Sequence, residues 1–103
     1  MPVEEIVDVR DALVAALCDL VNEVGRFGET ATTFDDAEAG LRGWGRLPNE
    51  TLAEIHDLYV NLDVLARIGS ISSMQANAAS APARQVIEAF QRLTQRIRLG
   101  QAA

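Results

Sequence analysis

Four side chains on one predicted helix could carry out acid–base chemistry. They recur at i, i+3, i+7 and i+11 along one helix edge: His56, Tyr59, Asp63 and Arg67. Imidazole, phenol and carboxylate groups serve as general acids and bases, so a groove at these residues is one hypothesis for a small helical enzyme. The same spacing also arises on any solvated helix edge of mixed composition, with Tyr59 partly in the core and Asp63 paired to Arg67.

The composition argues against metal, cofactor and lysine-based catalysis. His56 is the single histidine, its neighbour Asp57 points in another direction, and no Glu-x-x-His pair exists. The chain contains no lysine, which reflects either GC-rich coding or avoidance of lysine modification, and this excludes Schiff-base chemistry. Cys18 is the single cysteine, so no internal disulfide forms, and without an adjacent base its thiol is expected to be inert. We therefore predict no metal and no cofactor.

Charge is divided between the two ends of the chain. Met1–Asp63 holds fourteen acids and four arginines, a balance of −10, whereas Val64–Ala103 holds one acid and five arginines, a balance of +4. The last predicted helix carries four of these arginines: Arg84, Arg92, Arg96 and Arg98. Its single acid, Glu88, is expected to pair along the helix with Arg84 and Arg92. Nucleic-acid binding by this helix is the alternative function, although the acidic body and the lack of an outward-facing aromatic residue weigh against it.

Two further residues are candidates for an interface. Arg10 lies inside the apolar face of the first predicted helix, where an unpaired guanidinium is costly. Either it pairs with an acid of a neighbouring helix or reaches the edge of the face, or it fixes the register of a subunit interface. Trp44 lies between Gly43 and Gly45. It either closes the end of the bundle or, if exposed, forms a binding hot spot.

Apolar residues at spacings of three and four predict the elements that position these side chains. The first helix covers Val3–Val24 and ends at Gly25. Its apolar face is broader than a bundle of this size requires, and surplus apolar surface indicates an interface. A short second helix begins at Thr33, where Thr33-x-x-Asp36 forms a capping box, and Gly43 and Gly45 end it.

The third predicted helix starts near Pro48–Asn49 and ends at Ile68, with Thr51-x-x-Glu54 as a candidate cap. Its apolar stripe consists of Leu52, Ile55, Leu58, Tyr59, Leu62 and Leu65. The segment Ser70–Ser80 is small and polar. It forms a loop, a short helix, or part of a bent helix that continues into the last one.

Pro82 predicts the start of the last helix, with Ser80 or Ala81 as its cap, because proline is favoured at the first helical position. This helix ends at Gly100, and its apolar seam consists of Val86, Phe90, Leu93 and Ile97. Together the patterns predict an all-α fold in a single domain over residues 1–103. The expected architecture is a small bundle of three long helices plus one or two short helices.

These features favour a non-enzymatic protein-interaction module. We expect a homodimer that acts as an adaptor or inhibitor, using its acidic surface to attract a basic protein partner. The N-terminal residues lack the basic region of a signal peptide, and no apolar run reaches the length of a membrane span. The expected location is the cytoplasm of a prokaryote, or of a cell infected by a phage.

Overall fold

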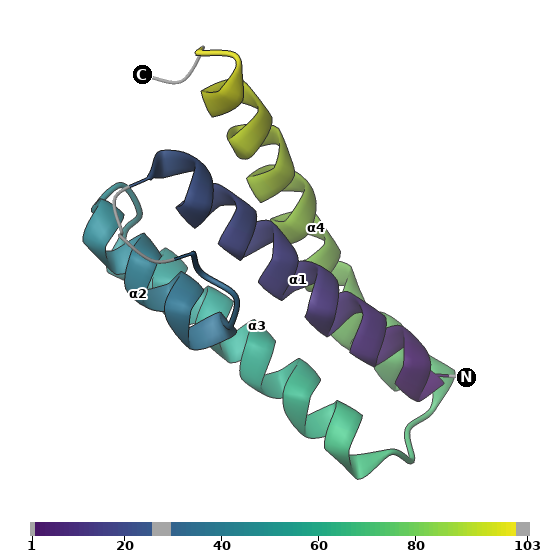
Figure 1. The fold of residues 1–103 in the computed structure, drawn as a ribbon. Coiled ribbons are helices and arrows are strands. Elements are labelled where there is room, and N and C mark those ends of the chain that lie inside the picture. Colours follow the sequence, from purple (N-terminus) through teal and green to yellow (C-terminus); the bar gives the residue numbers. More distant parts are fainter. Residues whose placement is uncertain (1, 26–29, 101–103) are drawn as a thin grey trace.

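Four helices occur in the residues described by the computed structural model, which are 2–25 and 30–100 (Figure 1). The helices are α1 (Pro2–Val24), α2 (Phe34–Trp44), α3 (Asn49–Ile68) and α4 (Ser73–Arg98). These residues contain no strand, so the predicted all-α class is confirmed, as is a small bundle of three long helices and one short helix. The bundle is elongated, with extents of 42 × 23 × 22 Å.

α1 is the central helix and packs against each of the other three. In Figure 1 it runs through the middle of the bundle, with α3 on one side and α4 on the other. Its buried residues are Ile6, Val9, Leu13, Ala16, Leu17, Cys18, Leu20 and Val21. The breadth of its apolar face is therefore accounted for by three neighbours within the chain, and an external interface is not needed to explain it.

The ends of the helices follow local hydrogen-bonding rules, with two departures from expectation. The Thr33 hydroxyl accepts a hydrogen bond from the Asp36 backbone N–H at 3.1 Å, so Thr33 caps α2 as predicted. The capping box is only half formed, because the Asp36 carboxylate accepts from the N–H of Thr32, at 3.3 Å, rather than from that of Thr33. The cap expected at Thr51 is wrong, because α3 already begins at Asn49, after Pro48, without a side-chain cap.

The prediction that Pro82 opens the last helix, capped by Ser80 or Ala81, is wrong. α4 begins at Ser73, and a capping box precedes it: the Ser72 hydroxyl accepts from the Gln75 N–H at 3.1 Å, and the Gln75 side chain accepts from the Ser72 N–H at 2.8 Å. This box starts the helix early enough to place Pro82 in its interior. Of the alternatives left open for residues 70–80, the continuous helix is therefore the correct one.

The buried face of α4 is rotated slightly from the predicted seam. Phe90 is buried as expected, but the flanking buried positions are Ile87 and Thr94, while the other three seam residues are only partly buried. The N-terminal half of the helix buries only small side chains: Ala76, Ala79, Ser80 and Ala83. Small side chains let helix backbones approach closely. The sequence prediction missed this face because it followed only the large apolar residues at spacings of three and four.

Candidate protein-binding surfaces

The four residues proposed for a catalytic groove are split between two separate clusters. His56 is half exposed, and its Nδ1 lies 2.9 Å from the carboxylate of Glu38 on α2. Tyr59 stacks on the ring of Phe34, also on α2, with centroids 4.0 Å apart and ring planes 5° apart. The Phe34 ring lies 6.0 Å from that of His56. His56 and Tyr59 thus attach α3 to α2.

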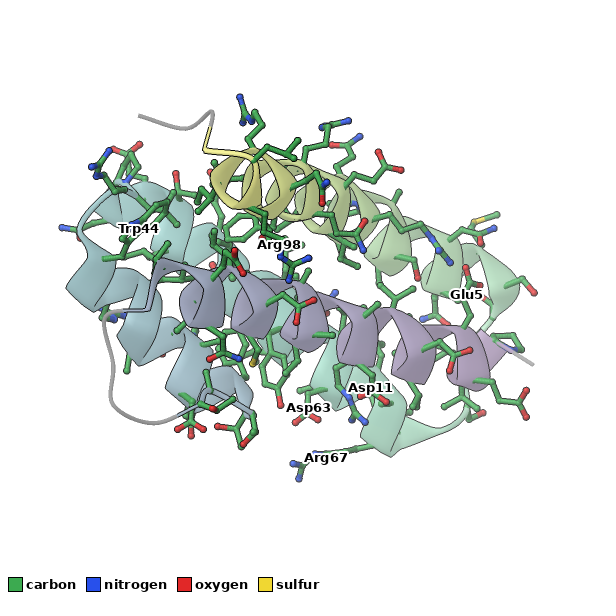
Figure 2. The ribbon with its side chains drawn as sticks, turned by 45° about the horizontal axis from the view of Figure 1, so that its top comes forward. Glu5, Asp11, Trp44, Asp63, Arg67 and Arg98 are labelled. Carbon is green, nitrogen blue, oxygen red and sulfur yellow. The ribbon has the colours of Figure 1, made fainter. Side chains whose placement is uncertain are left out.

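Asp63 instead belongs to an ion-pair network with Arg10. One carboxylate oxygen of Asp63 accepts from Arg10 at 3.0 Å, and the other accepts from Arg67 at 3.1 Å. Arg10 also donates to Asp11 at 3.3 Å. Figure 2 shows Asp11, Asp63 and Arg67 on the same side of the bundle. The first expectation for Arg10, a pairing with an acid of a neighbouring helix, is therefore confirmed.

This network favours the charged form of Arg10. Burial disfavours the charged form of Arg10, but hydrogen bonds and charges from Asp11 and Asp63 outweigh that effect, and the pKa of Arg10 is raised. Each oxygen of Asp63 is taken by a guanidinium. Because both oxygens are occupied, Asp63 is poorly suited to act as a general base, and the network ties α1 to α3.

Trp44 is half-buried at the C-terminal end of α2, where it packs against the core. Figure 2 places it at one end of the bundle. Of the two expectations for this residue, its position fits closure of the bundle end better than an exposed hot spot.

Two of the C-terminal arginines are used inside the chain. Arg84 donates to Glu5 at 3.2 Å, and Arg98 donates to Glu23 at 3.1 Å, so α4 is linked to both ends of α1. Figure 2 shows Arg98 between the two helices. Both side chains stay about half exposed, but each is already engaged by an acid of α1. The pairs expected between Glu88 and Arg84 or Arg92 are absent from residues 2–25 and 30–100.

Arg92 and Arg96 remain exposed on the outer face of α4. Neither forms an ion pair within the part of the chain that the structure describes. Together with Gln95 and Leu99 they line a shallow hollow of about 410 Å³. These two residues are therefore the arginines of α4 that stay available to another molecule.

An apolar stripe lies on the outer face of α3, which the sequence patterns did not single out. Val60, Val64 and Ile68 are 43%, 48% and 58% exposed, although each is a large aliphatic residue. They recur every fourth position, on the side of α3 opposite its buried residues Leu52, Ile55 and Leu62. A count of apolar residues outside the main stripe would have found this second face. We call these three residues the α3 stripe.

A groove of about 640 Å³ separates α3 from α4. Its apolar lining comes from both helices: Ile55, Leu58, Pro82, Val86, Ala89 and Phe90. Glu54 and Asp57 are exposed residues of its lining, and no basic residue takes part in that lining. We call this the α3–α4 groove. It was not anticipated, because Pro82 was placed at a helix start rather than on a groove wall.

Cys18 lies beside a second groove, between α1 and the segment before α2. Burial, followed by the charges of Asp36 and Asp19, raises the pKa of the Cys18 thiol. Its sulfur donates a weak hydrogen bond to the carbonyl of Thr33 at 3.5 Å. Arg10 and Tyr59 line the same groove of about 630 Å³. A protonated, buried thiol is a poor nucleophile, so the arrangement does not favour covalent chemistry.

Three broader observations complete the description. Within residues 2–25 and 30–100, no group of three or more His, Cys, Asp or Glu side chains could hold a metal ion. None of the helices in those ranges has the length and apolar content needed to cross a membrane. Comparison of the chain with protein-family models, with curated proteins and with solved structures finds no match.

Proposed function

We propose that this chain is a non-enzymatic protein-interaction module that pairs with a second copy and binds a basic protein, as an adaptor or an inhibitor. The observation that carries the proposal is the α3 stripe. Three aliphatic side chains in a row, each about half exposed, are more than the scattered apolar residues of an ordinary surface. Burying such a face against another molecule removes apolar surface from water, and this favours association.

A second copy of the chain is the occupant that fits the α3 stripe. When two α3 helices cross antiparallel about a two-fold axis, Val60 of one copy faces Val64 of the other. In that same register Asp57 comes opposite Arg67 of the partner subunit, because both pairs are centred on the same position of the helix. Arg67 is 78% exposed and keeps donors beyond its bond to Asp63. In this register the apolar residues of the face meet each other and its opposite charges meet across the two-fold axis.

The acidic surface supports a basic partner. The chain carries a net charge of −6, and two arginines of α4 are already paired with acids of α1. A third groove, of about 670 Å³ between α1 and α4, has four acids and one arginine in its lining: Glu4, Glu5, Asp8, Glu88 and Arg84. A surface of this sign increases the rate of encounter with cationic proteins and repels nucleic acid.

The two other candidate functions have less support. Nucleic-acid binding would rest on Arg92 and Arg96 alone, since Arg84 and Arg98 pair with α1. Catalysis would need His56, Tyr59 and Asp63 in one groove, and they engage different partners. A gel shift at low salt tests the first, with Arg92→Gln/Arg96→Gln as the variant, and no shift excludes it.

Light scattering at increasing concentration tests the pairing. We expect a shift from one to two chain masses with a dissociation constant of roughly 10–100 µM, because a face this small makes a transient interface. Val60→Ser/Val64→Ser should remain monomeric. Met74→Ser is the matched control, since Met74 is 80% exposed but lies outside the stripe. A wild-type chain that remains monomeric up to about 500 µM contradicts the proposed pairing.

The basic partner is tested separately, by affinity capture from the native host at low and at moderate salt. We expect a cationic protein to be retained at low salt and released as salt rises. Capture of acidic proteins, or retention that is indifferent to salt, contradicts this part of the proposal.

A further inference from the structure

We infer that the α3–α4 groove is the binding site for a cationic amphipathic helix of the partner protein. This inference rests on the proposed function, since it assigns the basic partner to one surface. The groove has an apolar floor formed by two helices and an acidic rim, and these are the two features that such a segment requires.

The floor of the groove is what remains open between two helices that both pack on α1. α3 and α4 each contact α1 more extensively than they contact each other. Leu58 and Val86 are only partly buried as a result, and Ala89 is exposed. An additional helix laid between α3 and α4 would cover these side chains and complete the packing around α1's two neighbours.

The dimensions of the groove set the length of the segment. Its α3 wall extends from Thr51 to Asn61, which corresponds to about 15 Å at 1.5 Å per residue, and its α4 wall from Pro82 to Phe90, about 12 Å. A partner helix of two to three turns fits this length. Two or three apolar anchors at i, i+3 or i+4, and i+7 would reach the floor.

The charges set the chemistry of the flanking positions. Glu54 and Asp57 lie one turn apart on the α3 side, and the polar residues that complete the lining are neutral: Thr51, Asn61 and Gln85. In the proposed pair Asp57 lies opposite Arg67 of the partner subunit, so Glu54 is the acid that stays available to the bound segment. Arginine or lysine on the edge of the bound helix next to Glu54 would therefore meet an acid flanked by neutral groups. An acidic helix would be repelled by the same rim. This asymmetry is the reason for choosing a cationic segment as the occupant.

Titration with a defined peptide tests the inference. The probe is a fluorescein-labelled 14-residue helix with leucine at positions i, i+3, i+4 and i+7 and arginine on one flank, measured by fluorescence anisotropy at about 50 mM salt. We expect saturable binding. Ala89→Arg, which places a cation in the groove from an exposed position, should weaken it at least about thirtyfold. Unchanged affinity in Ala89→Arg overturns the assignment.

A pair of single-charge variants on one helix separates the groove from general attraction. Glu54 lies in the groove lining, whereas Glu50, one turn earlier on α3, is exposed outside that lining. Glu54→Gln should weaken binding about threefold, as expected for one exposed ion pair, and Glu50→Gln should leave it nearly unchanged. Equal effects of the two variants overturn the groove while leaving a basic partner in place. A separate result, the failure to capture any cationic protein from the host, would contradict the basic partner in the proposed function.

Discussion

Replacing Gly40 with alanine should destabilise the fold, even though alanine forms helices better than glycine. Gly40 is a buried residue of α2 and lies against Val21 of α1. A Cβ atom at position 40 would lie 2.9 Å from Val21 Cγ2 and 3.2 Å from Val21 Cβ, and closer still to Cγ1. Ordinary contacts between such carbon atoms are about 3.5–4.0 Å, so one of the two helices must move.

The sign of the effect depends on two opposing contributions. The change from glycine to alanine in a helix interior stabilises by about 1 kcal/mol. Overpacking of a core contact costs typically about 1–3 kcal/mol. Val21 cannot relieve the contact by rotation, because a β-branched side chain in a helix has one strongly preferred rotamer and both of its methyl groups lie near the new atom. The difference between the two contributions is a net loss in free energy of unfolding of up to about 2 kcal/mol.

Urea unfolding followed by far-ultraviolet circular dichroism measures this loss. The diagnostic variant is Val21→Ala/Gly40→Ala, which removes both methyl groups that meet the new atom. If the contact is the cause, the alanine at position 40 becomes neutral or stabilising in that background, with a coupling free energy of at least about 1 kcal/mol. A Gly40→Ala variant that is more stable than the wild type would refute the close approach of α1 and α2 at this point.

Three further predictions follow from individual residues. Ser80 is buried with a hydroxyl that has no hydrogen-bond partner, so Ser80→Ala should raise the free energy of unfolding by about 1 kcal/mol in the same urea assay; a loss would mean that the hydroxyl is satisfied. Hydrogen bonds from Thr32, then Thr33, lower the pKa of Asp36. Its contribution to stability is therefore present above the ordinary aspartate pKa of about 4 and disappears as the pH falls through the lowered value, so the difference between wild type and Asp36→Asn should shrink at acidic pH. The native Cys18 thiol should react with a disulfide reagent at pH 8 at least about tenfold more slowly than the unfolded chain, and equal rates would contradict its burial.

Local patterns were sufficient where a single helix determines the outcome. The spacing of apolar residues placed α1 and α3 within one or two residues of their observed bounds. The glycines after α2 and α3 have left-handed backbone conformations, with φ of 73° at both Gly45 and Gly69, which is why these residues marked helix ends correctly.

Prediction failed where two neighbouring signals competed. Pro82 is a strong signal for a helix start, and Ser72 with Gln75 is another. Ser72 and Gln75 form two hydrogen bonds with each other, and the small residues that follow them pack as a buried helix face. The proline lies ten positions after the cap residue, and its local preference for a helix start did not prevail.

Contacts between helices were the part of the candidate site that the sequence predicted least well. That Arg84 and Arg98 reach Glu5 and Glu23 depends on α4 lying along α1, which no pattern within one helix encodes. The α3 stripe and the α3–α4 groove depend in the same way on which faces the other helices cover. The residue types predicted a partner-binding surface, and the place that we propose for it depends on how the helices pack.

The position of α1 at the centre also determines the order in which the chain can fold. Its most extensive neighbour is α4, and the ion pair between Glu5 and Arg84 joins residues 79 positions apart. While the polypeptide is being synthesised, the apolar side of α1 must wait for nearly the whole of the remaining sequence before α4 covers it. A helical protein rich in local contacts would normally fold within microseconds to milliseconds, but this distant pairing places it toward the slow end of that range. Until α4 emerges from the ribosome, the nascent chain exposes a surface that chaperones recognise.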